Sequence, residues 1–138
     1  MKIRKAEISD CKKICQLLKT PELIDSLANI DMKDYLNKIA GKNDLFLVAE
    51  IEKKVVGFVL GEELLGKCAY AHLMAVDNNF RGKGIGGELM ETLKKKAKIK
   101  KIDYLFFFAP KENSKLVEFY KNHKFNRKGE YILFDTAI

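Results

Sequence analysis

A glycine-rich turn is the part of this sequence whose residue types and spacing most clearly indicate chemistry. The stretch Arg81-Gly82-Lys83-Gly84-Ile85-Gly86-Gly87 follows an apolar run and opens an amphipathic helical pattern. The first amides of a helix have no partner inside it and can bind an anion, and glycines let phosphate oxygens approach the backbone closely. Arg81 and Lys83 add positive charge suited to a pyrophosphate. The alternative is a tight turn whose glycines only permit close packing of helix against strand.

The turn fits other nucleotide loops less well. No Lys-Ser or Lys-Thr pair follows the glycines, as a P-loop requires. Gly82, Gly84 and Gly87 do satisfy the spacing G-x-G-x-x-G. However, no opening strand–helix–strand unit precedes them, and the chain of 138 residues is too short for a dinucleotide-binding pair of such units.

The hydrophobic pattern around the turn predicts one domain over residues 1–138, in which helices alternate with a mixed sheet. We expect about seven strands and about four helices, an α+β or α/β arrangement. The expected strands are 3–6, 45–49, 55–60, 68–76, 103–109, one near Phe125 and 131–134. The expected helices begin at Ser9 or Asp10, span 32–39 and 84–98, and begin at Asn113 or Ser114. The apolar run 103–109 is suited to the centre of the sheet.

Two segments resemble motifs of the GNAT superfamily of N-acetyltransferases. The segment from Leu73 to Met90 resembles its acetyl-CoA-binding motif, [Q/R]-x-x-G-x-[G/A], and Asn113 to Phe125 resembles its pattern N-x-x-A-x-x-F-Y-x-x-x-G-F. Weaker similarities at the N-terminus and in the hairpin extend the resemblance over nearly the whole chain. Two residues depart from the second motif. Leu116 replaces the usual Ala, and Lys124 replaces a Gly at a position that commonly needs a left-handed turn.

The resemblance implies the GNAT fold, with a mostly antiparallel sheet splayed between its fourth strand and its fifth. The pantetheine arm of acetyl-CoA would lie in that gap, its pyrophosphate would bind the glycine turn, and no metal would be needed. The implied cofactor-binding residues are Met74, Ala75, Val76, Arg81, Gly82, Lys83, Gly84, Ile85, Gly86, Gly87, Asn113 and Tyr120.

The implied reaction is transfer of an acetyl group from acetyl-CoA to a primary amine by direct attack. Tyr120 matches the family's general acid, because a phenol of pKa about 10 can protonate a thiolate of pKa about 8.5. The alternative for Tyr120 is an aromatic side chain packed between helix and sheet. The non-catalytic alternative for the chain is a CoA-binding regulatory domain of the same fold.

The general base remains open among His72, Glu62, Glu63 and water. Strand alternation places His72 on the same face as Tyr70 and Met74, and histidine titrates in the useful range. A structural, hydrogen-bonded histidine is the alternative, and the two glutamates could instead bind a cationic substrate. The resemblance places a strand distortion near Val76, whose amide would then stabilise the oxyanion.

The net charge of +7 favours anionic partners, and much of it lies in the run from Lys94 to Lys101. This run either meets the CoA 3′-phosphate or forms a solvated helix end. We expect a cytoplasmic monomer or homodimer, without a membrane span, a bound metal or a nucleic-acid partner. The acceptor amine, a small molecule or a protein, would be selected by residues 21–39 and 62–67, in which no motif is recognised.

Overall fold

The computed structural model describes residues 1–19, 32–132, 134 and 136. Contacts divide the chain into two compact units, Met1–Phe107 and Phe108–Ile138, and each is described here by itself. A single domain over 1–138 therefore stays a prediction. Pro21 and most of the segment expected to select the acceptor lie outside the described residues.

The first unit is built on a five-stranded sheet in the order β1-β2-β3-β4-β5. The strands are β1 (Lys2–Lys5), β2 (Phe46–Ile51), β3 (Lys54–Leu64), β4 (Cys68–Val76) and β5 (Tyr104–Phe106). Neighbouring strands are antiparallel except for β4 and β5, which run parallel. This confirms a mixed, mostly antiparallel sheet.

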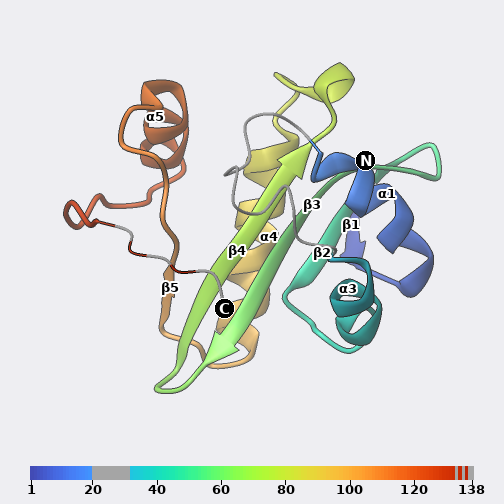
Figure 1. The fold of residues 1–138 in the computed structure, drawn as a ribbon, viewed down its shortest axis with the longest axis horizontal. Helices are drawn as coiled ribbons and strands as arrows, with labels where there is room; N and C mark the ends of the chain where they lie inside the picture. The colour runs from blue at the N-terminus through green and yellow to red at the C-terminus, as the bar shows by residue number, and fades with distance from the viewer. Residues whose placement is uncertain (20–31, 133, 135, 137–138) are drawn as a thin grey trace. The chain divides into compact units, whose positions relative to one another are not determined.

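Helices cover both faces of this sheet (Figure 1). On one face, α1 (Cys11–Leu17), which follows η1 (Ile8–Asp10), and α3 (Lys33–Ile39) pack on a buried apolar cluster that includes Phe58 and Leu60 of β3. On the other lies α4 (Ile85–Ile99), which follows η2 (Asn78–Phe80). A Cβ built on Gly61 of β3 would approach Leu93 of α4 to 3.0 Å. Glycine at this position therefore lets α4 approach the sheet closely.

The predicted inward face of α4 is confirmed. Ile85, Leu89, Leu93 and Ala97 are all buried, with at most 4% of their surface exposed. Their spacing places them on one stripe of the helix, which faces the sheet. This packing fixes the first turn of α4 relative to β4, so the position of the glycine turn follows from the core.

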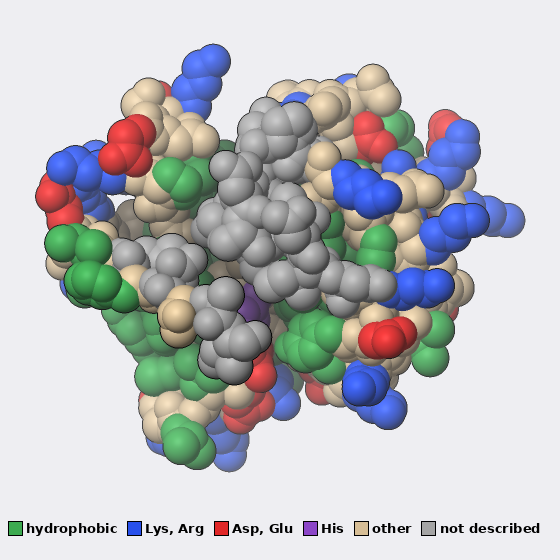
Figure 2. All heavy atoms as spheres, in the orientation of Figure 1, with side chains coloured by type: hydrophobic (Ala, Val, Ile, Leu, Met, Phe, Trp, Pro, Cys, Tyr) green, Lys and Arg blue, Asp and Glu red, His purple; other side chains and the backbone are tan. Residues whose placement is uncertain are grey.

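Charged side chains lie over the surface of the first unit, and blue and red residues are interspersed over α1 and α3 (Figure 2). Lys5 pairs with Asp44 at 3.0 Å, and Lys13 pairs with Asp77 at 3.1 Å. Within the described residues, no helix is both long enough and apolar enough to cross a membrane.

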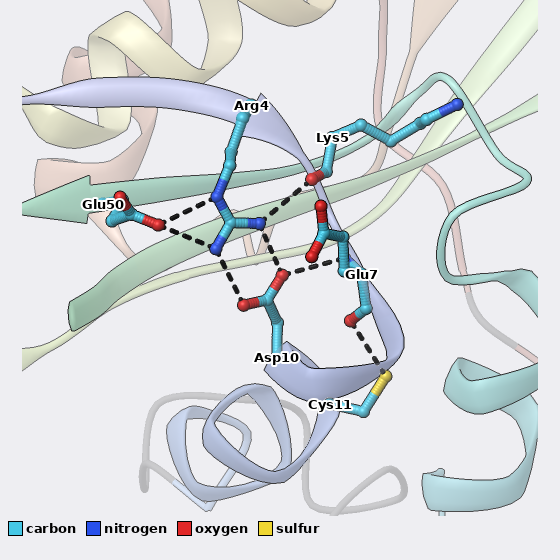
Figure 3. Close-up of polar contacts among 6 residues, drawn as sticks. All are labelled: Arg4, Lys5, Glu7, Asp10, Cys11 and Glu50. Carbon is cyan, nitrogen blue, oxygen red and sulfur yellow. Dashed lines mark hydrogen bonds and ion pairs between the residues drawn. The ribbon is translucent and has the colours of Figure 1, made fainter. Parts of the chain in front are cut away.

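A guanidinium clamp joins β1, β2 and η1 (Figure 3). Arg4 donates two hydrogen bonds to Asp10, at 2.7 and 2.9 Å, and one to Glu50 at 2.9 Å. Burial alone would raise the pKa of Asp10, but hydrogen bonds from Arg4 and from the Glu7 amide hold it below its usual value. The side chain of Asp10 therefore serves this clamp and the capping box of η1, and it makes no capping bond to α1, whose first residue is Cys11.

Within the described residues the sheet has five strands, where about seven were expected. The apolar run 103–109 forms only the three residues of β5, and in the described residues β5 lies at the edge of the sheet rather than at its centre. The strand expected near Phe125 is absent, and the described residues of 131–134 form none. Strand formation requires a partner as well as an apolar sequence, and hydrophobic pattern alone does not supply the partner.

The second unit contains α5 (Ser114–Asn122). The Asn113 side chain caps it by accepting the Leu116 amide at 3.1 Å. Just beyond the helix, Lys124 has a φ of 62°, which confirms the left-handed conformation expected where Lys replaces Gly. Such a residue costs about 1 kcal/mol relative to glycine.

Candidate active site

Two glycines of the turn face open space. Gly82 and Gly84 have φ values of +74° and +78°, and a Cβ built on either would meet nothing within 4 Å. Backbone conformation therefore explains these two glycines, and crowding against a neighbouring element does not. Gly87, in contrast, is buried in the first turn of α4 and fits the packing interpretation.

Among the described residues, no side chain caps the amides at the start of α4. Gly84 is the N-cap residue and has no side chain to accept a hydrogen bond. The first bond of the helix runs from the Glu88 amide to the Gly84 carbonyl, at 3.0 Å, so the amides of residues 85–87 precede it. The N–H groups of these amides and the N-terminal end of the helix dipole carry partial positive charge, so the turn can bind an anion. Because glycine has no Cβ, the anion can approach the backbone closely.

The two basic residues of the turn contact residues that immediately precede it in the chain. The Nε of Arg81 donates to the Val76 carbonyl at 3.2 Å, which ties the turn to the end of β4. The Lys83 ammonium lies 5.0 Å from the centre of the Phe80 ring. Both side chains are exposed and add positive potential to the turn.

The strand β4 extends beyond its parallel partner. Its register with β5 covers only Cys68 to Tyr70, whereas its register with β3 continues to Val76. In the described part of the chain, the β5-facing edge of residues 71–76 therefore lies past the end of that pairing. An extended strand edge offers alternating amides and carbonyls to another extended group, and this is where the pantetheine arm was expected.

A bulge in β4 changes which face its side chains occupy. Leu73 pairs with Leu60, but Ala71 pairs with Gly61, so His72 is the extra residue. His72 therefore shares a face with Tyr70, at a ring distance of 4.6 Å. Met74 pairs with Val59 and points to the opposite face, so its expected alignment with His72 was wrong. The register shift also lies here rather than at Val76, where the distortion was expected.

The structure separates the candidate bases. His72 Nε2 lies 2.5 Å from Glu62 Oε2, with 34% and 46% of the two side chains exposed. Successive residues of a strand point to opposite faces, and Glu63 accordingly pairs with Lys100 at the end of α4, at 3.1 Å. Only Glu62 shares a site with His72.

In the second unit, Tyr120 packs between two phenylalanines of its own segment. Its ring lies 5.2 Å from that of Phe119 and 5.9 Å from that of Phe125. Burial raises the pKa of Tyr120 to about 12, so the phenol keeps its proton at neutral pH. Asn113, expected to face the cofactor, uses its side-chain oxygen as the cap of α5.

Two features of the site were not anticipated. The first is the contact between Glu62 of β3 and His72 of β4, which lie ten residues apart in sequence. The second is the contact between the Tyr70 and Phe106 rings, at 5.3 Å across β4 and β5. Both contacts follow from the register of neighbouring strands, which the sequence alone did not supply. The bulge at His72 also interrupts the simple alternation of side chains along β4.

Comparison with known proteins agrees with this geometry. The profile of the Acetyltransferase (GNAT) family matches residues 12–125. An acetyltransferase of Photorhabdus laumondii is 27% identical over 139 residues, which span 100% of this chain and 96% of that protein. An aminoglycoside acetyltransferase from an uncultured soil sample, solved with sisomicin, is 25% identical with a TM-score of 0.78, and the match covers 99% of this chain and 95% of that one. A transcriptional regulator of Bacillus halodurans shares the fold, with 18% identity, a TM-score of 0.81 and coverage of 98% and 99%. The match to the family covers most of the chain and both of its units, and the chain belongs to the GNAT family of acyl-CoA-dependent acetyltransferases.

Proposed function

We propose that this protein transfers the acetyl group of acetyl-CoA to a primary amine. In this proposal the pyrophosphate of acetyl-CoA binds the turn of residues 81–87, and its pantetheine arm lies along Met74 to Val76. The observation that carries this proposal is the uncapped start of α4 behind two left-handed glycines. These residues fit the cofactor because they offer free amides, positive charge and no Cβ between backbone and phosphate.

The chemistry requires two proton transfers. As the amine nitrogen forms its bond to the acetyl carbon, that carbon loses its bond to sulfur. The proton leaving the nitrogen would pass to His72, and the departing thiolate would take a proton from Tyr120. A phenol of pKa about 12 remains protonated until it is needed, and general acid catalysis of this kind contributes about 10²- to 10⁴-fold.

The named relatives support an amine acceptor. One solved neighbour is described as an aminoglycoside acetyltransferase and was crystallised with sisomicin, an amine-bearing compound. We infer that the acceptor of this chain also presents a primary amine. This class is narrower than the family membership alone, which fixes only acetyl transfer.

The test is a panel of primary amines assayed by release of free CoA thiol, beside calorimetric titration with CoA. We expect CoA binding and acceptor-dependent thiol release. CoA binding without release for any amine would favour the regulatory alternative. Absence of CoA binding at millimolar concentration would refute the proposed site.

A further inference from the structure

Aromatic rings form a continuous row on the face of the sheet opposite α4. Tyr104 and Phe106 of β5 lie 5.9 Å apart, Phe106 lies 5.3 Å from Tyr70 of β4, and Tyr70 lies 4.6 Å from His72. All these side chains are partly or largely exposed, with Tyr104 at 50%. Aromatic rings attract cations through their quadrupoles.

A carboxylate stands at one end of this row. Glu62 is paired with Tyr70 in the register of β3 and β4, and its Oε2 contacts His72. Tyr35 of α3 lies within its electrostatic reach, since burial and then the charge of Glu62 raise the pKa of that phenol. Over the hairpin end of β3 and β4, red acidic, blue basic and green apolar side chains lie together (Figure 2). Glu62 therefore places a carboxylate beside the aromatic row in a chain whose net charge is +7.

The row lies where β4 and β5 separate. Tyr70 and Phe106 are the last pair in the register of these strands, and the edge of β4 beyond them is where we place the pantetheine arm. A group bound beside Glu62 would therefore lie next to the amine that is acetylated. This inference rests on the proposed function.

We propose that Glu62, with the rings of Tyr70 and Phe106, binds a second ammonium group of the acceptor, so that the acceptor is a diamine, polyamine or aminosugar. The reacting amine must be neutral to attack, and a carboxylate holds an amine in its protonated form. A carboxylate among aromatic rings is therefore suited to a cation that stays charged throughout the reaction. Glu62 is a specificity-determining residue in this proposal, and it takes no proton.

The experiment compares cadaverine with aminopentanol, which replaces one amine by a neutral hydroxyl. With wild-type protein, kcat/KM per primary amine should be at least about tenfold higher for cadaverine, equivalent to about 1.4 kcal/mol. Glu62→Gln should remove this preference. Glu91→Gln is the matched control, because Glu91 on α4 is equally exposed, at 45%, and is also ion-paired, with Lys94. It should keep the preference.

Calorimetry in the presence of CoA provides a readout that does not need turnover. Cadaverine should bind wild-type protein and Glu91→Gln, and its affinity for Glu62→Gln should fall about tenfold, or about 1.4 kcal/mol. Equal use and equal binding of the two amines, or equal effects of the two variants, would overturn the subsite. Loss of thiol release with every amine, while cadaverine binding still depends on Glu62, would refute acetyl transfer to these amines and leave the subsite supported.

Discussion

The substitution Gly84→Glu tests the cofactor turn against a matched control. Gly84 and Gly41 have nearly identical φ values, +78° and +76°, and a Cβ on either would meet nothing within 4 Å. Placing glutamate at each should therefore cost a similar amount, about 1–2 kcal/mol for a left-handed residue. The two variants differ in place, since Gly84 begins α4 and Gly41 lies between α3 and β2. Only the first puts a negative charge where we expect the pyrophosphate.

Thermal melting with and without CoA measures this difference. At 100 times its Kd, CoA should stabilise the wild-type protein by about 2.7 kcal/mol. For a chain of this size, that corresponds to a Tm increase on the order of 10 °C. Both variants should melt lower than wild type without CoA, but only Gly41→Glu should keep the increase. Calorimetry then gives Kd directly. If Gly84→Glu and Gly41→Glu bound CoA equally well, the pyrophosphate would lie elsewhere and the reasoning from the uncapped helix start would fail.

Further substitutions test the chemistry and the clamp. Tyr120→Phe should lower kcat at least about tenfold with little change in CoA affinity. Because the phenol stays protonated up to about pH 12, wild-type activity should show no loss from Tyr120 ionisation between pH 6 and 10. Unchanged kcat, with chemistry rate-limiting, would remove Tyr120 as the acid. His72→Ala should lose most activity near neutral pH and less as pH rises, because free amine then forms unaided, whereas a profile of unchanged shape would indicate a structural role. Asp10→Asn should lower the free energy of unfolding by about 2 kcal/mol, measured in urea. Since its folded pKa is depressed, Asp10 contributes stability above its unfolded pKa of about 3.9, and this is lost as pH falls through the folded pKa. A wild-type and variant difference that persisted at low pH would contradict this ionic origin.

Local signals in the sequence were sufficient for the turn and its helix. The glycine turn, the stripe from Ile85 to Ala97 and the start of α5 each depend on residues a few positions apart, and α4 and α5 begin within one residue of the positions expected. The left-handed Lys124 was also expected, because a motif position that usually holds Gly indicates a positive φ. Such features depend on short-range conformation, which the sequence specifies directly.

The strands after α4 were predicted less well because strand length depends on partners. The run 103–109 is apolar throughout, yet only Tyr104 to Phe106 pair with β4. An apolar pattern shows that a segment can join a sheet, but the number of paired residues depends on how far the neighbouring strands run together. The same separation of β4 from β5 that shortens the pairing also creates the edge on which the proposed cofactor site depends.

The bulge at His72 explains why the predicted alignment of His72 with Met74 was wrong. Strict alternation put His72 on the same face as Tyr70 and Met74. One extra residue moves Met74 to the face of α4 and leaves His72 with Tyr70 and Glu62. The register shift thus brings the candidate base beside a carboxylate and a row of rings, on the side opposite α4. The bulge is the local irregularity that leaves Met74 and His72 on different faces of β4.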